Sequence, residues 1–107
     1  MEYEVKTFDQ VSVVIEANIY FDGNVSSRTI NFPDGTIKTL GLMLPGEYHF
    51  GTDAPELMEI TQGSVEYRLN ESDDWTKVNA GGEFNVPGKS SFDIRASEVS
   101  DYVCSFL

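Results

Sequence analysis

Hydrophobic and polar residues alternate along several short stretches of the chain, which is the pattern of β-strands with one buried face. The alternation is clear in residues 40–44, 65–69, 92–96 and 102–106. In the first of these stretches every second residue is a leucine. The best helical candidate, residues 53–58, is short and is interrupted by a proline. The pattern therefore predicts strands and no long helix.

Turn-forming residues separate these stretches at intervals of roughly 8–12 residues. The turn clusters are Asp22-Gly23, Pro33-Asp34-Gly35, Pro45-Gly46, Gly63, residues 70–74, Gly81-Gly82 and Pro87-Gly88. Glycine accepts positive φ, proline fixes φ, and Asn and Asp bond to their own backbone, so each cluster has a reason to turn. Many short strands with regular turns predict an all-β sandwich or barrel.

Length and charge narrow the classes of function. The chain has 107 residues, enough for one small domain, and a net charge of −11 from 18 acidic and 7 basic side chains. So acidic a protein lacks the basic face that a nucleic-acid partner requires. A hydrophobic content of 40% argues against a disordered acidic tail. We expect no membrane partner and a cytoplasmic location, because the sequence has neither a membrane-length apolar stretch nor a secretory-type N-terminus.

A glycine- and proline-containing stretch in the middle of the chain resembles the first motif of the cupin superfamily. Six residues separate Glu56 from Gly63, as in that motif, and His49 stands at its first histidine position. The second histidine position holds Gly51. The resemblance implies an all-β fold consisting of a single small cupin-type (jelly-roll) β-barrel.

Residues 81–92 resemble the second cupin motif, but Phe92 stands where that motif has a histidine. With a single histidine in the chain, a metal would have only His49 and Glu56, two ligands short of a firm site. Cys104 is the only cysteine, which excludes an internal disulfide and a cysteine-based zinc site. We expect Cys104 to be a small buried residue and the protein to bind no metal.

Longer runs resemble one family within the superfamily. These runs are residues 18–28, 39–52, 55–59, 84–87 and 101–104. They are similar to the small pyrimidine/purine nucleoside phosphorylases, and the resemblance covers residues 16–107 as a single cupin domain. Residues 1–15 are then an N-terminal arm or strand. The resemblance implies phosphorolysis of purine and pyrimidine ribonucleosides to free base and ribose 1-phosphate by a homodimer. It also implies no metal or organic cofactor, with inorganic phosphate as co-substrate.

Phosphorolysis develops positive charge on the ribose ring, which a carboxylate can stabilise. By cupin geometry Glu56 points into the barrel, so it is the candidate catalytic residue. Met58 lies two residues further on the same strand face and is a candidate to contact the base or ribose. Phe92, at the lost metal position, is a candidate to stack on the base. The alternative for Phe92 is simple filling of the barrel.

Phosphate is the harder substrate for so acidic a protein, because the overall field repels an anion and local donors must bind it. Arg28 and Lys38 are the candidate cations, since arginine can fork onto two phosphate oxygens. Thr52 and Ser91 are candidate hydroxyl or backbone donors, and His49 is a further candidate substrate ligand. Each of these residues has an alternative interpretation as a solvated surface side chain. We expect Arg28 or Lys38 at the mouth of the pocket if either binds phosphate.

Two other functions stay open at this point. A non-catalytic small-molecule-binding cupin would explain the same loss of metal ligands, and would show ligand-dependent stabilisation without turnover. A metal-dependent cupin enzyme would use His49 and Glu56. Phosphate-dependent release of base from a nucleoside would distinguish a nucleoside phosphorylase from both alternatives.

Overall fold

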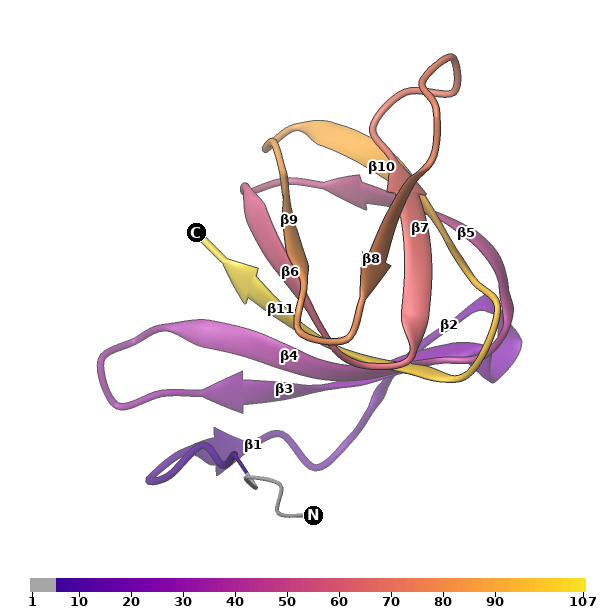
Figure 1. Ribbon diagram of the computed structural model, residues 1–107. Coiled ribbons are helices and arrows are strands. Elements are labelled where there is room, and N and C mark those ends of the chain that lie inside the picture. The colour runs from indigo at the N-terminus through magenta and orange to yellow at the C-terminus, as the bar shows by residue number, and fades with distance from the viewer. Residues whose placement is uncertain (1–5) are drawn as a thin grey trace.

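The computed structural model describes residues 6–107, and in these the chain forms two antiparallel β-sheets (Figure 1). The larger sheet has the order β1-β3-β4-β11-β6-β9, and β2 also pairs with β3. Its strands are β1 (Ser12–Val13), β2 (Asn18–Tyr20), β3 (Val25–Asn31), β4 (Ile37–Met43), β6 (Glu56–Gln62), β9 (Glu83–Val86) and β11 (Ser100–Phe106). The smaller sheet has the order β5-β10-β7-β8, with β5 (Gly46–Thr52), β7 (Ser64–Arg68), β8 (Thr76–Asn79) and β10 (Ser90–Ala96).

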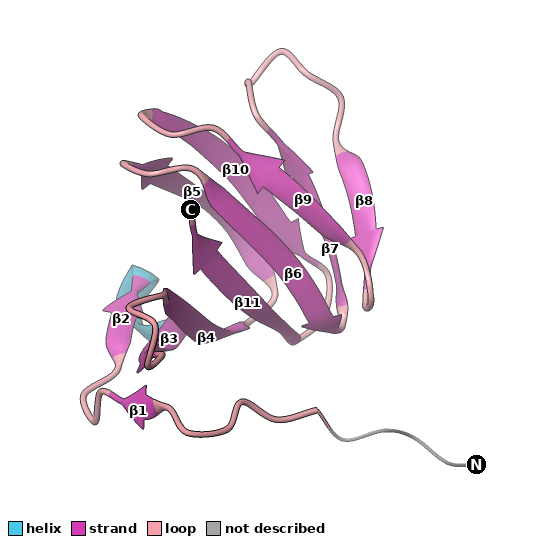
Figure 2. Cartoon of the chain, turned by 90° about the vertical axis from the view of Figure 1, so that its left-hand side faces the viewer, coloured by secondary structure: helices cyan, strands magenta, loops and turns pink. Residues whose placement is uncertain are grey.

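The two sheets face each other (Figure 2). The core lies between them, where their inner faces carry the buried apolar side chains. Met58 and Ile60 of β6 face inward from the larger sheet, and Phe92 and Ile94 of β10 face inward from the smaller one. Each pair is separated by one residue, as strand geometry requires. The all-β prediction is therefore confirmed, and the alternation in residues 92–96 marks a buried face as expected.

The prediction of one closed barrel is not confirmed by strand pairing. Within residues 6–107 the hydrogen-bonded ladders form two separate sheets, and β5 and β8 remain the edges of the smaller one. The sheets meet through side chains rather than through a continuous ladder. The predicted N-terminal arm is described only from residue 6, where Ser12 and Val13 pair with β3; the prediction for residues 1–5 lies outside the described part.

The spacing between Glu56 and Gly63 is the length of one strand. Glu56 begins β6, Gln62 ends it, and Gly63 turns the chain into β7. Gly63 has φ +86°, and a Cβ there would lie 2.3 Å from Ser100 Oγ. Glycine is needed at this turn for both reasons.

The leucines of β4, and Leu44 directly after it, share one face as the alternation predicts, but that face is the outside of the molecule. Leu40 and Leu42 are each 42% exposed and Leu44 is 37% exposed, while Thr39 and Met43 are buried on the inner face. The helical content of residues 6–107 is one short 3-10 turn at Phe21–Gly23, which is far too short to cross a membrane.

Candidate active site

A cavity of about 360 Å³ lies between the two sheets, beside the loop that joins β5 to β6. Both inner faces and that loop contribute to its wall. The lining residues are Tyr20, Ser27, Thr39, Met43, Phe50, Gly51, Asp53, Ala54, Glu56, Met58, Phe92, Tyr102, Cys104 and Phe106. None of the lining residues within 6–107 is a lysine, arginine or histidine.

Glu56 is half-buried in this wall because β6 begins at the rim and runs inward. Its Oε1 accepts a hydrogen bond from Cys104 Sγ, at 3.4 Å. Burial raises the pKa of the Glu56 carboxyl, and the hydrogen bond from Cys104 opposes part of that rise. The carboxyl is thus held in a partly apolar setting, where a charge acts more strongly than it does in water.

The central strand β11 supplies two further polar groups to the wall. Cys104 is in register with Met58 of β6, and Tyr102 is in register with Gly41 of β4. A Cβ at Gly41 would lie 2.0 Å from Tyr102 Cζ, so this glycine makes room for the tyrosine ring. Burial raises the pKa of both Tyr102 and Cys104 well above the ordinary values. Both groups therefore keep their protons at neutral pH and can act as donors.

The opposite side of the cavity is aromatic and apolar. Phe92, only 3% exposed, stacks on Phe50 with ring centroids 5.7 Å apart, and Tyr20 meets Phe50 edge-on at 5.8 Å. Met58 adds a thioether to the floor. A flat, partly apolar ligand fits such a wall.

The β5–β6 loop, which lines the cavity, is tied by hydrogen bonds to the β9–β10 loop beside it. Thr52 Oγ1 donates to the Pro87 carbonyl at 2.7 Å and accepts from the Ser90 amide at 3.0 Å. The Lys89 amide donates to the Asp53 carbonyl at 3.0 Å. These contacts fix the β5–β6 loop against the β9–β10 loop.

Three of the predicted site residues meet in the cavity, namely Glu56, Met58 and Phe92. Thr52 lies next to lining residues, but its hydroxyl is engaged in the loop contacts. Ser91 is the neighbour of Phe92 on β10, so its side chain points to the opposite, outer face of the smaller sheet.

His49 also lies outside the cavity, on the outer face of β5. Its side chain is 62% exposed, and Nδ1 donates to Asp93 Oδ1 at 2.7 Å. Arg68 Nε donates to the other oxygen of Asp93 at 3.0 Å. The two candidate metal ligands, His49 and Glu56, are therefore not brought together. Residues 6–107 contain no cluster of three His, Cys, Asp or Glu side chains suited to a metal ion.

The two candidate phosphate cations lie on the outside of the larger sheet. Arg28 donates to the Ile15 carbonyl and lines a separate hollow of about 520 Å³. Lys38 Nζ lies 5.5 Å from the centre of the Phe8 ring. Both side chains point outward because successive residues of a strand alternate between its two faces, and the adjacent Ser27 and Thr39 take the inward positions.

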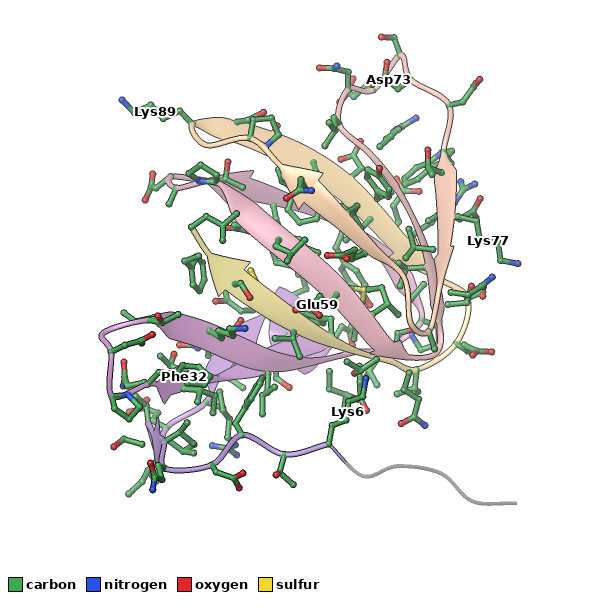
Figure 3. All side chains as sticks on the ribbon, turned by 60° about the vertical axis from the view of Figure 1, so that its left-hand side comes forward. Lys6, Phe32, Glu59, Asp73, Lys77 and Lys89 are labelled. Atoms are coloured by element: carbon green, nitrogen blue, oxygen red, sulfur yellow. The ribbon has the colours of Figure 1, made fainter. Side chains whose placement is uncertain are left out.

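The remaining cations do not enter the cavity wall either. Arg68 and Arg95 both lie over the Trp75 ring on the outside of the smaller sheet, at 4.4 and 4.0 Å from its centre. Figure 3 shows Lys77 and Lys89 extending away from the body of the protein. The expectation that a cation stands at the pocket mouth is therefore not met by Arg28 or Lys38.

Sequence reasoning missed the contributions of Tyr20, Tyr102, Cys104 and Asp53 to the wall. The alternation of Tyr102 and Cys104 was visible, so a shared face was predictable. That this face lies against Glu56 depends on the pairing of β11 with β6, which joins residues more than forty positions apart.

Comparison with known proteins identifies the family. The family model described as pyrimidine/purine nucleoside phosphorylase matches residues 15–106. A relative of that name from Sulfurovum sp. is 55% identical over 103 residues, covering 96% of this chain and all of the relative. Another from Geobacter sulfurreducens is 54% identical over 94% of this chain and 96% of the relative.

Solved structures agree with the fold. A crystal structure of a protein of unknown function from Acinetobacter sp. ADP1 has a TM-score of 0.91 and 43% identity, covering 94% of this chain and 98% of that one. A cupin-superfamily protein from Desulfitobacterium hafniense has a TM-score of 0.66 over 87% of this chain and 83% of that one, at 17% identity, and shows the fold alone. The match over nearly the whole chain places this protein in the pyrimidine/purine nucleoside phosphorylase family of enzymes.

Proposed function

We propose that the protein cleaves both purine and pyrimidine ribonucleosides with inorganic phosphate, giving free base and ribose 1-phosphate, and that the cavity is where it does so. The observation that carries the proposal is the pairing of one half-buried carboxyl, Glu56, with an aromatic and thioether wall in one half-open cavity. The wall suits a flat base and the carboxyl suits a ribose that becomes positively charged.

In this reaction a phosphate oxygen bonds to C1′ of the ribose while the bond from C1′ to the base nitrogen breaks. The bonding electrons leave with the base, which then takes up a proton. Positive charge on the ribose ring peaks between these events, and the Glu56 carboxylate stabilises it electrostatically. Tyr102, which keeps its proton, is a candidate donor to the departing base or the phosphate.

Broad base specificity follows from the chemistry of the wall. Phe50, Phe92 and Met58 offer surface area but no hydrogen-bonding group that would read a particular base edge. A site that does not read polar edges discriminates weakly between bases. This supports acceptance of both purines and pyrimidines.

Phosphate binding has to rest on neutral donors. The lining residues include hydroxyls at Ser27 and Thr39 and carry no cation, while Arg28 and Lys38 lie on the outer face. Backbone amides and hydroxyls can bind an anion without a formal charge. We expect weak phosphate binding, and therefore a high KM for phosphate.

The deciding experiment incubates the purified protein with uridine and with adenosine, with and without phosphate, and measures base and ribose 1-phosphate. Release of base that requires phosphate, and is unchanged by a chelator, is the expected result. No release, or release independent of phosphate, would overturn the proposal. Saturable thermal stabilisation by nucleoside without turnover would instead favour a binding cupin.

Three further features of the proposal concern the setting of the enzyme. The reaction needs no metal or organic cofactor, because the carboxyl and neutral donors supply the chemistry. The protein works as a homodimer, supported by the outward leucines Leu40 and Leu42 of β4. It works in the cytoplasm, supported by a single cysteine that is not paired in the fold.

A further inference from the structure

Cys104 touches the one carboxyl that the proposed reaction uses, although sequence reasoning gave it only a packing role. Its thiol is 5% exposed, lies in the cavity wall, and is 3.4 Å from Glu56 Oε1. Glu56 Oε1 has no other hydrogen bond within residues 6–107. The other oxygen, Oε2, has no protein partner there and is not among the buried unpaired atoms. Oε2 is therefore the oxygen left to face a ligand.

We propose that Cys104 is a positioning residue: its thiol holds Oε1 of Glu56 and so orients the free oxygen toward the ribose. The inference rests on the function proposed above. The register supports it, because Cys104 sits opposite Met58, two residues from Glu56 on the same face of β6. A half-buried carboxyl without this contact could adopt several rotamers, and a loosely held group stabilises a transition state poorly.

The thiol is suited to this task because it keeps its proton. Burial first, and the neighbouring Glu56 charge second, raise the pKa of Cys104 well above its ordinary value. A thiolate could only repel the carboxylate, whereas a thiol donates to it. The donor is weak, so it orients the carboxyl without neutralising it.

Few other titratable groups compete with this pair. Tyr102 on β11, Tyr20 on β2 and Asp53 in the β5–β6 loop complete the titratable lining of the cavity, and β9 and β10 contribute none. A change in the pKa of Glu56 on removal of the thiol can therefore be assigned to Cys104.

The test compares Cys104→Ala, which removes the donor, with Cys104→Ser, which keeps one. Ser105→Ala is the matched control, since Ser105 is the next residue, is also buried, and its hydroxyl has no partner. The first readout is the titration of the Glu56 carboxyl by carbon-13 NMR, with assignment by loss of the signal in Glu56→Gln. It needs no enzyme activity.

We expect Cys104→Ala to raise the pKa of Glu56, because burial remains and the stabilising donor is gone. Cys104→Ser should restore it, and Ser105→Ala should not move it. In the phosphorolysis assay, kcat should fall about tenfold in Cys104→Ala with little change in KM. The acid limb of the pH profile of kcat should move to higher pH in Cys104→Ala, and Cys104→Ser should recover most of the activity.

An unchanged Glu56 titration in Cys104→Ala would overturn the inference, as would full activity with an unchanged pH profile. If the wild-type protein releases no base, the proposed function fails on its own. The titration then still decides whether the thiol controls the carboxyl.

Discussion

Glu56 is the residue on which the proposed chemistry depends. Among residues 6–107 it is the only carboxyl that the strands contribute to the cavity wall, since Asp53 belongs to the β5–β6 loop. Its neighbours are aromatic rings, thioethers and neutral donors, so no cation in the described wall screens its charge. In such surroundings a carboxylate acts strongly on a cationic transition state.

Glu56→Gln should therefore lower kcat about a hundredfold while the protein stays folded, since the amide has nearly the same size. Glu59→Gln is the control, because Glu59 lies on the same strand but on its opposite face, and it does not line the cavity. Steady-state kinetics with uridine measure both variants. Equal kcat in Glu56→Gln and wild type would remove Glu56 from this role.

Asp93, on the outer face of the smaller sheet, is the hydrogen-bond partner of the single histidine, His49. The His49 hydrogen bond first, and Arg68 second, lower the pKa of Asp93. A carboxyl with a lowered folded pKa stabilises the fold above its unfolded pKa, roughly 3.9, and that stabilisation is lost as pH falls through the folded value.

Asp93→Asn should consequently lower the free energy of unfolding at pH 5 by up to about 1 kcal/mol. The difference from wild type should shrink as pH falls below about 4, where the wild-type carboxylate becomes protonated. Urea unfolding at a series of pH values measures it. Asp74→Asn is the control, because Asp74 forms no ion pair within residues 6–107. A difference that persists undiminished to pH 3 would contradict this account.

At the scale of elements, the β5–β6 loop that lines the cavity is joined to the β9–β10 loop through Thr52. Its hydroxyl both donates to Pro87 and accepts from Ser90, so one side chain satisfies two backbone groups. Removing it leaves both groups without their partner at a site where Thr52 is only 8% exposed. The cost of such a loss is about 1–3 kcal/mol.

Thr52→Val should thus lower the free energy of unfolding by about that amount, and the Ser90 amide should exchange faster with solvent. Thr52→Ser should keep most of the stability because it keeps the hydroxyl. Thr76→Val, at an exposed position of β8, should change stability by less than about 0.5 kcal/mol. Urea unfolding and hydrogen exchange measure these effects, and equal losses in the two valine variants would disprove the tie.

The elements were largely predictable because strand alternation and turn chemistry act over a few residues. Residues 65–69, 92–96 and 102–106 were identified as strands from alternation alone, and the Glu56–Gly63 spacing proved to be one strand. Whether a given strand face points to the core or to the outside was less predictable. The leucines of β4 share a face, yet topology turns that face outward.

The site was predictable only where its residues sit in motifs. Glu56 and Phe92 line the cavity as expected, while Arg28 and Lys38 do not. Arg28 lies at the end of a matched run and Lys38 directly before one, which does not say which strand face each occupies, and a shift of one residue reverses the face. Cys104 was missed as a partner of Glu56 because their contact depends on long-range pairing between β6 and β11.

At the scale of the whole molecule, the outer face of the larger sheet near β4 combines apolar side chains with the cation Arg28 and the carboxylate Asp101. Leu40 and Leu42 are exposed there, in register with Arg28 and Ser26 of β3. Exposed leucines that lie side by side on one face of a strand are costly to hydrate, and a second copy of the chain that covers them removes that cost. This is the physical basis for expecting a homodimer.

Leu42→Arg should convert such a dimer to a monomer, because a charged side chain replaces a leucine in the apolar contact and loses water there. Asp101, in register with residue 42, offsets only part of that cost. We expect dissociation to be favoured by about 3 kcal/mol, roughly a hundredfold in Kd. Light scattering during size exclusion measures the mass against twice the 11.9 kDa of the chain. Val99→Arg is the control, since Val99 is also exposed but lies between β10 and β11. A dimer that survives Leu42→Arg but not Val99→Arg would place the interface elsewhere, and a monomeric wild type would contradict the expected dimer.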